Sequence, residues 1–71
     1  MTTTAYPTVK VEHESHGDWE VEFPEAGSVR CQTLNDALRV AYREAARQSP
    51  CELVVYDAYH RVARYELLDR R

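Results

Sequence analysis

The sequence predicts a small α+β domain in which one helix packs on one face of a single, mainly antiparallel β-sheet. Polar and apolar residues alternate near both ends of the chain, as they do in strands, and an apolar stripe at helical spacing lies between them. The 71 residues leave room for one domain only. We expect the element order β-β-(β)-α-β-β in a single domain at residues 8–71, preceded by a flexible segment at residues 1–7.

The first two strands form a predicted hairpin, because alternation with period two begins at Thr8 and resumes at Trp19. Gly17 lies in the polar turn between them and is free to adopt a positive φ. Pro24 ends the second strand. The residues with core-facing parity are Val9, Val11, His13, Trp19, Val21 and Phe23, and those with outward parity are Lys10, Glu12, Glu14, Glu20 and Glu22.

A short third strand is predicted at residues 28–32, after a turn at residues 25–27. Its expected inward residues are Val29 and Cys31, and its outward residue is Arg30. The helix follows, with Thr33 as N-cap and Asp36 three residues later, near the positive end of the helix dipole. It ends before Pro50, because the residue preceding a proline avoids the α region. The apolar stripe consists of Leu34, Ala37, Leu38, Ala41, Tyr42 and Ala45.

Two more strands complete the predicted sheet. Residues 51–56 are apolar on both faces, which is typical of a strand inside a sheet. A turn at residues 57–60 leads into a last strand at residues 61–68, where alternation resumes. The expected core-facing residues of this strand are Ala63, Tyr65 and Leu67.

The composition is that of a globular protein, with 44% hydrophobic and 30% charged residues. No apolar run approaches the roughly 20 residues that span a bilayer, and residues 1–6 lack the charged and apolar regions of a signal peptide. We therefore expect a cytoplasmic protein with no membrane partner. In a reducing compartment Cys31 and Cys51 are expected to be small buried thiols, with a structural disulfide or a reactive thiol as alternatives.

Charge is distributed unevenly along the chain, whose net charge is −3. Residues 1–29 carry six acids and one base, whereas residues 30–71 carry six acids and eight bases. Four acids share the outward parity of the first hairpin, which predicts an acidic patch on the sheet face away from the helix. That patch is either a solvated face or a binding surface for a basic protein. The expected partner-binding residues are Glu12, Glu14, Glu20 and Glu22, with Tyr56 or Tyr59 as an apolar anchor.

The helix carries a second charged surface. Arg39, Arg43 and Arg47 are spaced i, i+4, i+8 and form a predicted basic ridge away from the core. This ridge is either a solvated face with ion pairs to Asp36 and Glu44 or a surface for nucleic acid. Three arginines without an exposed aromatic stack are a weak footprint for nucleic acid, so direct nucleic-acid binding is the less favoured alternative.

Motifs for catalysis or metal binding are weak. His13 and His16 have H-x-x-H spacing, whereas zinc motifs use H-x-x-x-H on a helix or paired cysteine units. With only two glycines, the chain has no glycine-rich phosphate loop. The sequence therefore predicts no catalytic residue, no metal and no cofactor, and we expect a protein that is not an enzyme.

Four motifs recur together in one group of proteins. They are Trp19-Glu-Val-Glu-Phe, Thr33-x-x-Asp-Ala37, Ala41…Ala45, and Glu52-Leu-Val-Val-Tyr-Asp57 followed by Arg61-Val62. Over residues 9–68 the chain thereby resembles a family of small bacterial ββαββ domains of unknown function. The family prefers Asp-Gly where this chain has Asp57-Ala-Tyr-His60. The resemblance implies the fold and no activity.

Two further resemblances concern function. Residues 21–27, together with Thr33, Ala37, Leu38 and Ala41, are similar to HicB-type antitoxins. The size, the strand and helix order and the acidic surface are similar to those of small phage anti-CRISPR proteins, from Pro7 through Leu67. Both groups bind and block a nucleic-acid-handling partner without catalysis.

The charge pattern and these resemblances together predict a small protein-binding module. We expect it to inhibit a basic, nucleic-acid-handling protein through its acidic sheet face. The alternatives are a nucleic-acid-binding domain that uses the arginine ridge and a self-associating structural domain, and the chain is expected to be a monomer or a homodimer.

Overall fold

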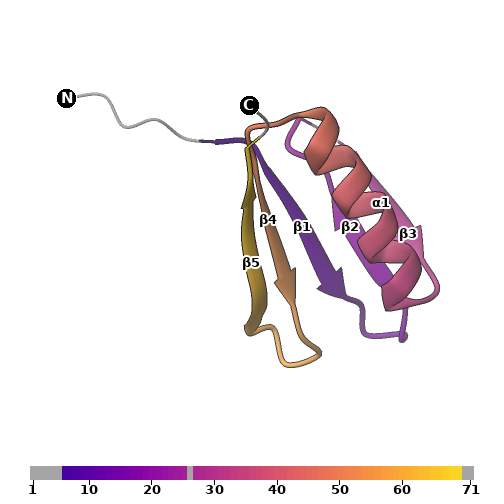
Figure 1. Cartoon of the computed structure of the whole chain (residues 1–71). Coiled ribbons are helices and arrows are strands. Elements are labelled where there is room, and N and C mark those ends of the chain that lie inside the picture. The colour runs from indigo at the N-terminus through magenta and orange to yellow at the C-terminus, as the bar shows by residue number, and fades with distance from the viewer. Residues whose placement is uncertain (1–5, 26, 70–71) are drawn as a thin grey trace.

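The computed structural model describes residues 6–25 and 27–69 and contains one helix and five strands (Figure 1). The elements are β1 (Thr8–His13), β2 (Trp19–Glu22), β3 (Ser28–Cys31), α1 (Leu34–Arg47), β4 (Cys51–Tyr56) and β5 (Val62–Leu68). The predicted α+β fold, with one helix packed on one face of a single sheet, is confirmed. Of the N-terminal segment predicted to be flexible, residues 1–5 lie outside the described residues.

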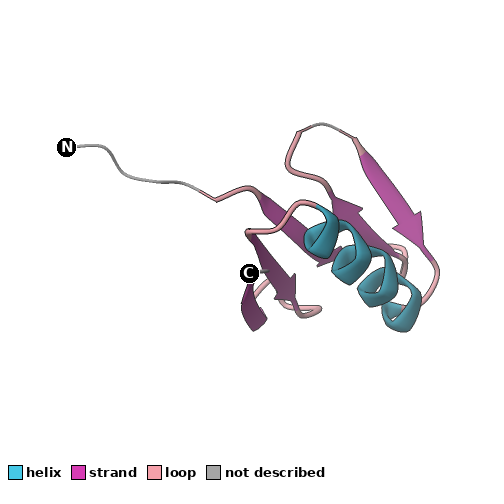
Figure 2. Cartoon of the chain, turned by 45° about the horizontal axis from the view of Figure 1, so that its top comes forward, coloured by secondary structure: helices cyan, strands magenta, loops and turns pink. Residues whose placement is uncertain are grey.

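The sheet has the strand order β3-β2-β1-β4-β5. Neighbouring strands are antiparallel except for β1 and β4, which are parallel, so the sheet is mainly antiparallel as predicted. The parallel pairing arises because α1 carries the chain back over the sheet between β3 and β4 (Figure 2). β4 is therefore an interior strand, in agreement with its apolar residues on both faces.

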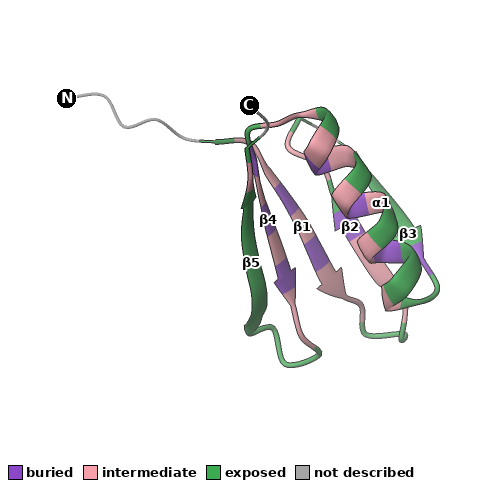
Figure 3. Ribbon diagram, in the orientation of Figure 1, coloured by how far each residue is buried: buried purple, intermediate pink, exposed green. Residues whose placement is uncertain are grey.

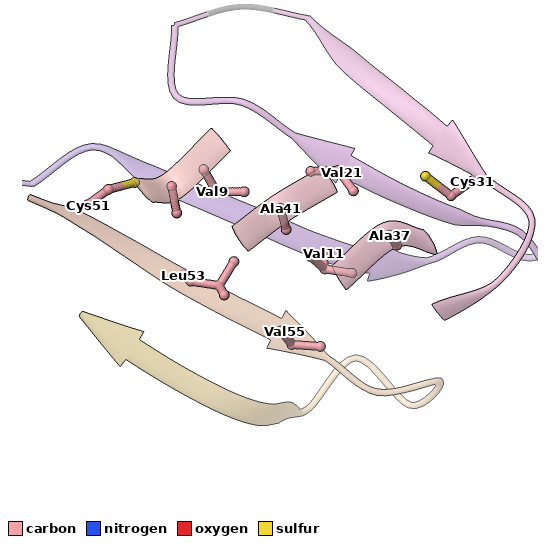
Figure 4. Close-up of a cluster of buried hydrophobic side chains, with 10 residues drawn as sticks. Val9, Val11, Val21, Cys31, Ala37, Ala41, Cys51, Leu53 and Val55 are labelled. Atoms are coloured by element: carbon pink, nitrogen blue, oxygen red, sulfur yellow. The ribbon is translucent and has the colours of Figure 1, made fainter. Parts of the chain in front are cut away.

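The core lies between α1 and the sheet, and the helix contributes only alanines to its fully buried part (Figure 4). Ala37, Ala41 and Ala45 are fully buried, and their small side chains let the helix lie close to the strands. The partly buried Leu34, Leu38 and Tyr42 pack around them, as the apolar stripe predicted. The buried strand residues are Val9, Val11, Val21, Cys31, Cys51, Leu53 and Val55.

The helix begins as predicted. Thr33 has an extended backbone, and its Oγ1 accepts a hydrogen bond from the N–H of Asp36 at 3.1 Å. The helix ends at Arg47, and Gln48 is its C-cap, two residues before Pro50.

The prediction that Ala63, Tyr65 and Leu67 face the core is wrong. In the β4–β5 register, Tyr65 lies opposite Val54 and Leu67 opposite Glu52, on the sheet face away from α1. The register shifts between Val55 and Tyr56, because a β-bulge leaves Ala63 without a partner in the ladder.

The reason for this error is the position of β5. It lies at the sheet edge away from α1, which packs on the other four strands, and every β5 residue except Leu68 is exposed (Figure 3). Neither face of β5 is buried, so the alternation of apolar and polar residues in β5 does not indicate which face is directed toward the core. β3, at the other edge, shows a weaker form of this effect: Cys31 is buried, but Val29 is 38% exposed although it lies opposite buried Val21.

Candidate binding surface on the open sheet face

The face of the sheet opposite α1, called here the open face, is covered by no other element of the described residues (Figure 2). Strand register decides which side chains share it, because directly paired residues lie on the same face. Across β1, β2 and β3 these residues are Lys10, Glu12, Glu20, Glu22, Ser28 and Arg30. Across β4 and β5 they are Glu52, Val54, Tyr56, Val62, Tyr65 and Leu67. The open face therefore has an acidic part over β1 and β2 and an apolar part over β4 and β5.

Three of the four predicted carboxylates, Glu12, Glu20 and Glu22, lie in the acidic part. Two cations lie among them: Lys10 is directly opposite Glu22, and Arg30 is directly opposite Glu20. The acidic part is therefore less negative than we expected from the outward-facing acids of the first hairpin alone.

Glu12 has a different neighbour. It lies directly opposite Glu20, so two like charges face each other across the strands. Glu20 also accepts a hydrogen bond from Ser28 Oγ at its Oε2, at 2.9 Å, which holds its carboxylate toward β3. Glu22 has Lys10 opposite it and Glu20 has Arg30. Of the three carboxylates in the acidic part, Glu12 is therefore the one whose strand partners include no cation.

Glu14 lies beyond the end of β1, in the turn. Its N–H donates to the carbonyl of Asp18 at 2.7 Å, and its carbonyl accepts from the N–H of Gly17 at 3.0 Å. Gly17 has the predicted positive φ, 92°. The backbone of Glu14 thus closes the β1–β2 turn, and the residue stands at the end of the acidic part instead of within it.

The apolar part of the open face is partly solvent-exposed. Tyr65 is 58% and Leu67 40% exposed, beside half-buried Val54. Partial desolvation and then the neighbouring Glu52 carboxylate raise the pKa of Tyr65. An exposed tyrosine among aliphatic side chains is a common anchor in protein interfaces.

The two predicted anchors, Tyr56 and Tyr59, lie in different places. Tyr56 is half-buried and follows Val55, which pairs with Val11, so Tyr56 lies beside Glu12 at the end of the β1–β4 pair. Tyr59 is 78% exposed in the turn between β4 and β5. The Arg61 guanidinium lies 5.3 Å from the centre of its ring. Of the two predicted anchors, Tyr56 is therefore the one that adjoins the acidic part.

Asp57 organises that turn. Its Oδ1 accepts hydrogen bonds from the N–H groups of Tyr59 at 2.8 Å and Arg61 at 2.9 Å. The Arg61 guanidinium also donates to Oδ2 at 3.3 Å. The N–H of Arg61, followed by that of Tyr59 and the charge of Arg61, lowers the pKa of Asp57 despite some desolvation. His60 completes the turn with a φ of 62°.

The predicted arginine ridge lies on the exposed side of α1, away from the open face. Arg39 Nη1 is 4.0 Å from Asp36 Oδ1, and Arg47 Nη2 is 2.8 Å from Glu44 Oε2. Hydrogen bonds from Arg47 and then Gln48 lower the pKa of Glu44, and Glu44 raises the pKa of Arg47. Arg43 has no ion pair among the described residues. Two of the three charges of the ridge are therefore offset by carboxylates of the same helix.

One polar cluster was missed by sequence reasoning. The Tyr42 hydroxyl donates to Glu66 Oε1 at 2.8 Å and accepts from Arg64 Nη1 at 3.0 Å. This cluster joins α1 to the helix-side face of β5. The sequence held two signals for this cluster. Arg64 and Glu66 are two residues apart, so they share one face of a strand, and Tyr42 belongs to the apolar stripe of the helix, where its hydroxyl needs a hydrogen-bond partner.

The two cysteines are free and buried, as predicted. Burial raises the pKa of Cys51, which keeps it a thiol and makes it a poor nucleophile. Within residues 6–25 and 27–69, no three His, Cys, Asp or Glu side chains are grouped so that they could hold a metal ion. No helix in the same ranges is long and apolar enough to cross a membrane.

Comparison with known proteins adds no relative: no family model matches the chain, and neither a curated protein nor a solved structure does.

Proposed function

We propose that this chain is a small protein-binding module whose open face binds a basic protein. The observation that carries the proposal is the position of Glu12 on a sheet face that α1 leaves uncovered: Glu20 lies directly opposite it on β2, and Tyr56 lies next to it at the end of β4. Carboxylates next to an aromatic anchor match what protein interfaces use: the charge speeds and orients association, and the buried ring supplies affinity. A rigid sheet lowers the entropy lost on binding.

The Glu12–Glu20 pair makes the surface selective for cations. Two carboxylates directly opposite each other repel, and a basic side chain placed between them would relieve that repulsion. A basic partner would stabilise the Glu22 carboxylate less, because Lys10 already lies opposite it. We therefore assign the main electrostatic contact to Glu12 and Glu20, with Glu22 at its rim.

The partner class that fits best is a nucleic-acid-handling protein. The carboxylates would occupy a positively charged groove in place of phosphates, so the chain would act as a non-catalytic inhibitor, as anti-CRISPR proteins and antitoxins do. The net charge of −3 supports this assignment. A cytoplasmic setting fits the two buried, free thiols, Cys31 and Cys51.

Binding measurements with charge variants test the proposal. Proteins retained by the immobilised chain would be identified by mass spectrometry, purified, and titrated by calorimetry over a series of salt concentrations. The double variant Glu12→Lys/Glu20→Gln should lose binding, because it removes the carboxylate pair. Glu25→Lys, an exposed acid outside the open face, is the matched control and should bind like the wild type. Equal binding by the wild type and the double variant at low salt would overturn the proposal.

A mobility-shift assay tests the arginine ridge. At low salt the wild type should shift neither DNA nor RNA, single- or double-stranded, because the ridge charges of Arg39 and Arg47 are offset. A shift that Arg43→Glu abolishes would identify a nucleic-acid-binding domain and would count against the proposed function.

A further inference from the structure

β5 is the longest strand among the described residues, and six of its seven residues are exposed. It has seven residues and pairs only with β4, whereas β3, the other edge strand, has four. Its N–H and C=O groups on the outer side face away from the sheet. Such an edge is a template for pairing with a further strand, and globular proteins usually shorten it, cover it or charge it.

The side chains of β5 are complementary to a second copy of β5. In an antiparallel pair centred on Tyr65, Arg64 lies opposite Glu66 of the second copy, and Glu66 lies opposite Arg64 of the second copy. Both contacts join opposite charges on the helix-side face. On the open face Tyr65 meets Tyr65 of the second copy, whereas Ala63, which the β-bulge takes out of the regular ladder, is not counted as a pair. Cross-strand pairs of these kinds stabilise sheets.

Only this register satisfies the charges. A slip of two residues in one direction places Arg64 opposite Arg64 of the second copy, and a slip in the other direction places Glu66 opposite Glu66. A slip of one residue would turn the second copy over and place charged residues opposite Tyr65. The order Arg64-Tyr65-Glu66 therefore selects one antiparallel alignment and penalises its neighbours.

The charged groups are already held on the correct face. The Tyr42 hydroxyl bonds both Glu66 Oε1 and Arg64 Nη1, which fixes the two side chains on the helix side of β5. Glu66 has a second carboxylate oxygen, and Arg64 has further N–H donors, with which to contact the second copy. The Tyr42 contacts thus set the face of the sheet on which both charges lie, and this is the face on which the second copy would meet them.

We propose that the chain forms a homodimer by antiparallel pairing of two β5 strands about a two-fold axis at Tyr65, which joins the two five-stranded sheets into one. Dimerisation is separate from the proposed binding of a basic partner. The carboxylates Glu12 and Glu20 lie on β1 and β2, which β4 separates from β5, so they stay accessible in the dimer. Either proposal can fail without the other.

Sedimentation equilibrium tests the dimer. At high concentration the wild type should have twice the chain mass of 8.3 kDa, and the mass should fall toward one chain on dilution. Arg64→Glu and Glu66→Arg each place like charges in both cross-strand contacts, and each should weaken dimerisation by about tenfold or more.

The double variant Arg64→Glu/Glu66→Arg exchanges the two charges and should restore the wild-type dimer. It is the matched control, because it also leaves Tyr42 one acid and one guanidinium to bond. A wild type that is monomeric at millimolar concentration would overturn the proposal, as would a dimer that neither single variant weakens.

Disulfide trapping tests the register. In the proposed dimer the two copies of residue 65 are directly opposite, with Cα atoms about 4.5–5.5 Å apart, which is within the reach of a disulfide. The two copies of residue 67 are offset by four positions, about 13 Å along the strand. Under mild oxidation Tyr65→Cys should form covalent dimers and Leu67→Cys should not, and Cys31 and Cys51 are buried in both. Equal trapping at the two positions would exclude this alignment.

Discussion

Glu12 lies directly opposite Glu20 across the β1–β2 pair, while two residues along β2 Glu22 lies opposite Lys10. Lysine substitutions at the two positions should therefore change stability in opposite directions. Glu12→Lys replaces a repulsive contact by an attractive one and should raise the free energy of unfolding, whereas Glu22→Lys should lower it, each by about 0.2–1 kcal/mol. Urea denaturation at low salt measures both effects.

High salt is the control for this pair, because both differences should shrink as the charges are screened. Shifts of the same sign in Glu12→Lys and Glu22→Lys would show that the register does not govern the charges of the open face. Since Glu12→Lys should also weaken binding of a basic partner, its gain in stability and its loss of binding can be separated in one variant.

The hydroxyl of Tyr42 links α1 to β5 through Glu66 and Arg64. Tyr42→Phe removes both hydrogen bonds and keeps the ring against the core, so it should lower the free energy of unfolding by about 0.5–1.5 kcal/mol. Tyr59→Phe is the matched control: this tyrosine is 78% exposed in a turn, and its loss of a hydroxyl should leave the denaturation midpoint unchanged. Equal effects of the two substitutions would contradict the assigned role of the Tyr42 hydroxyl.

Local signals made much of this fold predictable. The Thr33 cap, the alanine face of α1, the positive φ of Gly17 and the interior position of β4 each depend on a few adjacent residues or on a short repeat. The alanines of α1 and the inward residues of β4 also form the core, whereas Thr33 and Gly17 act through local backbone geometry alone.

The features that escaped prediction depend on strand order. The faces of Tyr65 and Leu67 could not be assigned, because β5 is exposed on both sides and its alternation has no buried reference. The cation opposite Glu20 could not be foreseen either, since it requires the β2–β3 register to bring Arg30 there. Contacts between strands are set by non-local pairing, which a periodic pattern within one strand does not encode.

His60 adopts a φ of 62° in the turn between β4 and β5. An L-residue in this left-handed region is strained, although histidine tolerates it better than most. His60→Gly should therefore be neutral or stabilise the protein by up to about 1 kcal/mol, because relief of strain outweighs the greater freedom of glycine in the unfolded chain. His16→Gly, at an exposed turn position without a positive φ, should destabilise it. Thermal denaturation compares the two, and a loss of stability in His60→Gly would contradict this prediction.

Asp57 links the stability of the β4–β5 turn to pH. The N–H groups of Arg61 and Tyr59 bond its Oδ1 and lower its pKa in the folded protein below that in the unfolded chain. Its contribution is therefore complete above the unfolded-state pKa and is lost as the pH falls through the folded-state pKa. Between pH 7 and pH 2, wild type should lose more stability than Asp57→Asn, and the two curves should approach each other in acid. Glu44 contributes acid sensitivity to both proteins, so the difference between their urea midpoints isolates Asp57. Parallel curves over the whole range would show that this carboxylate does not hold the turn.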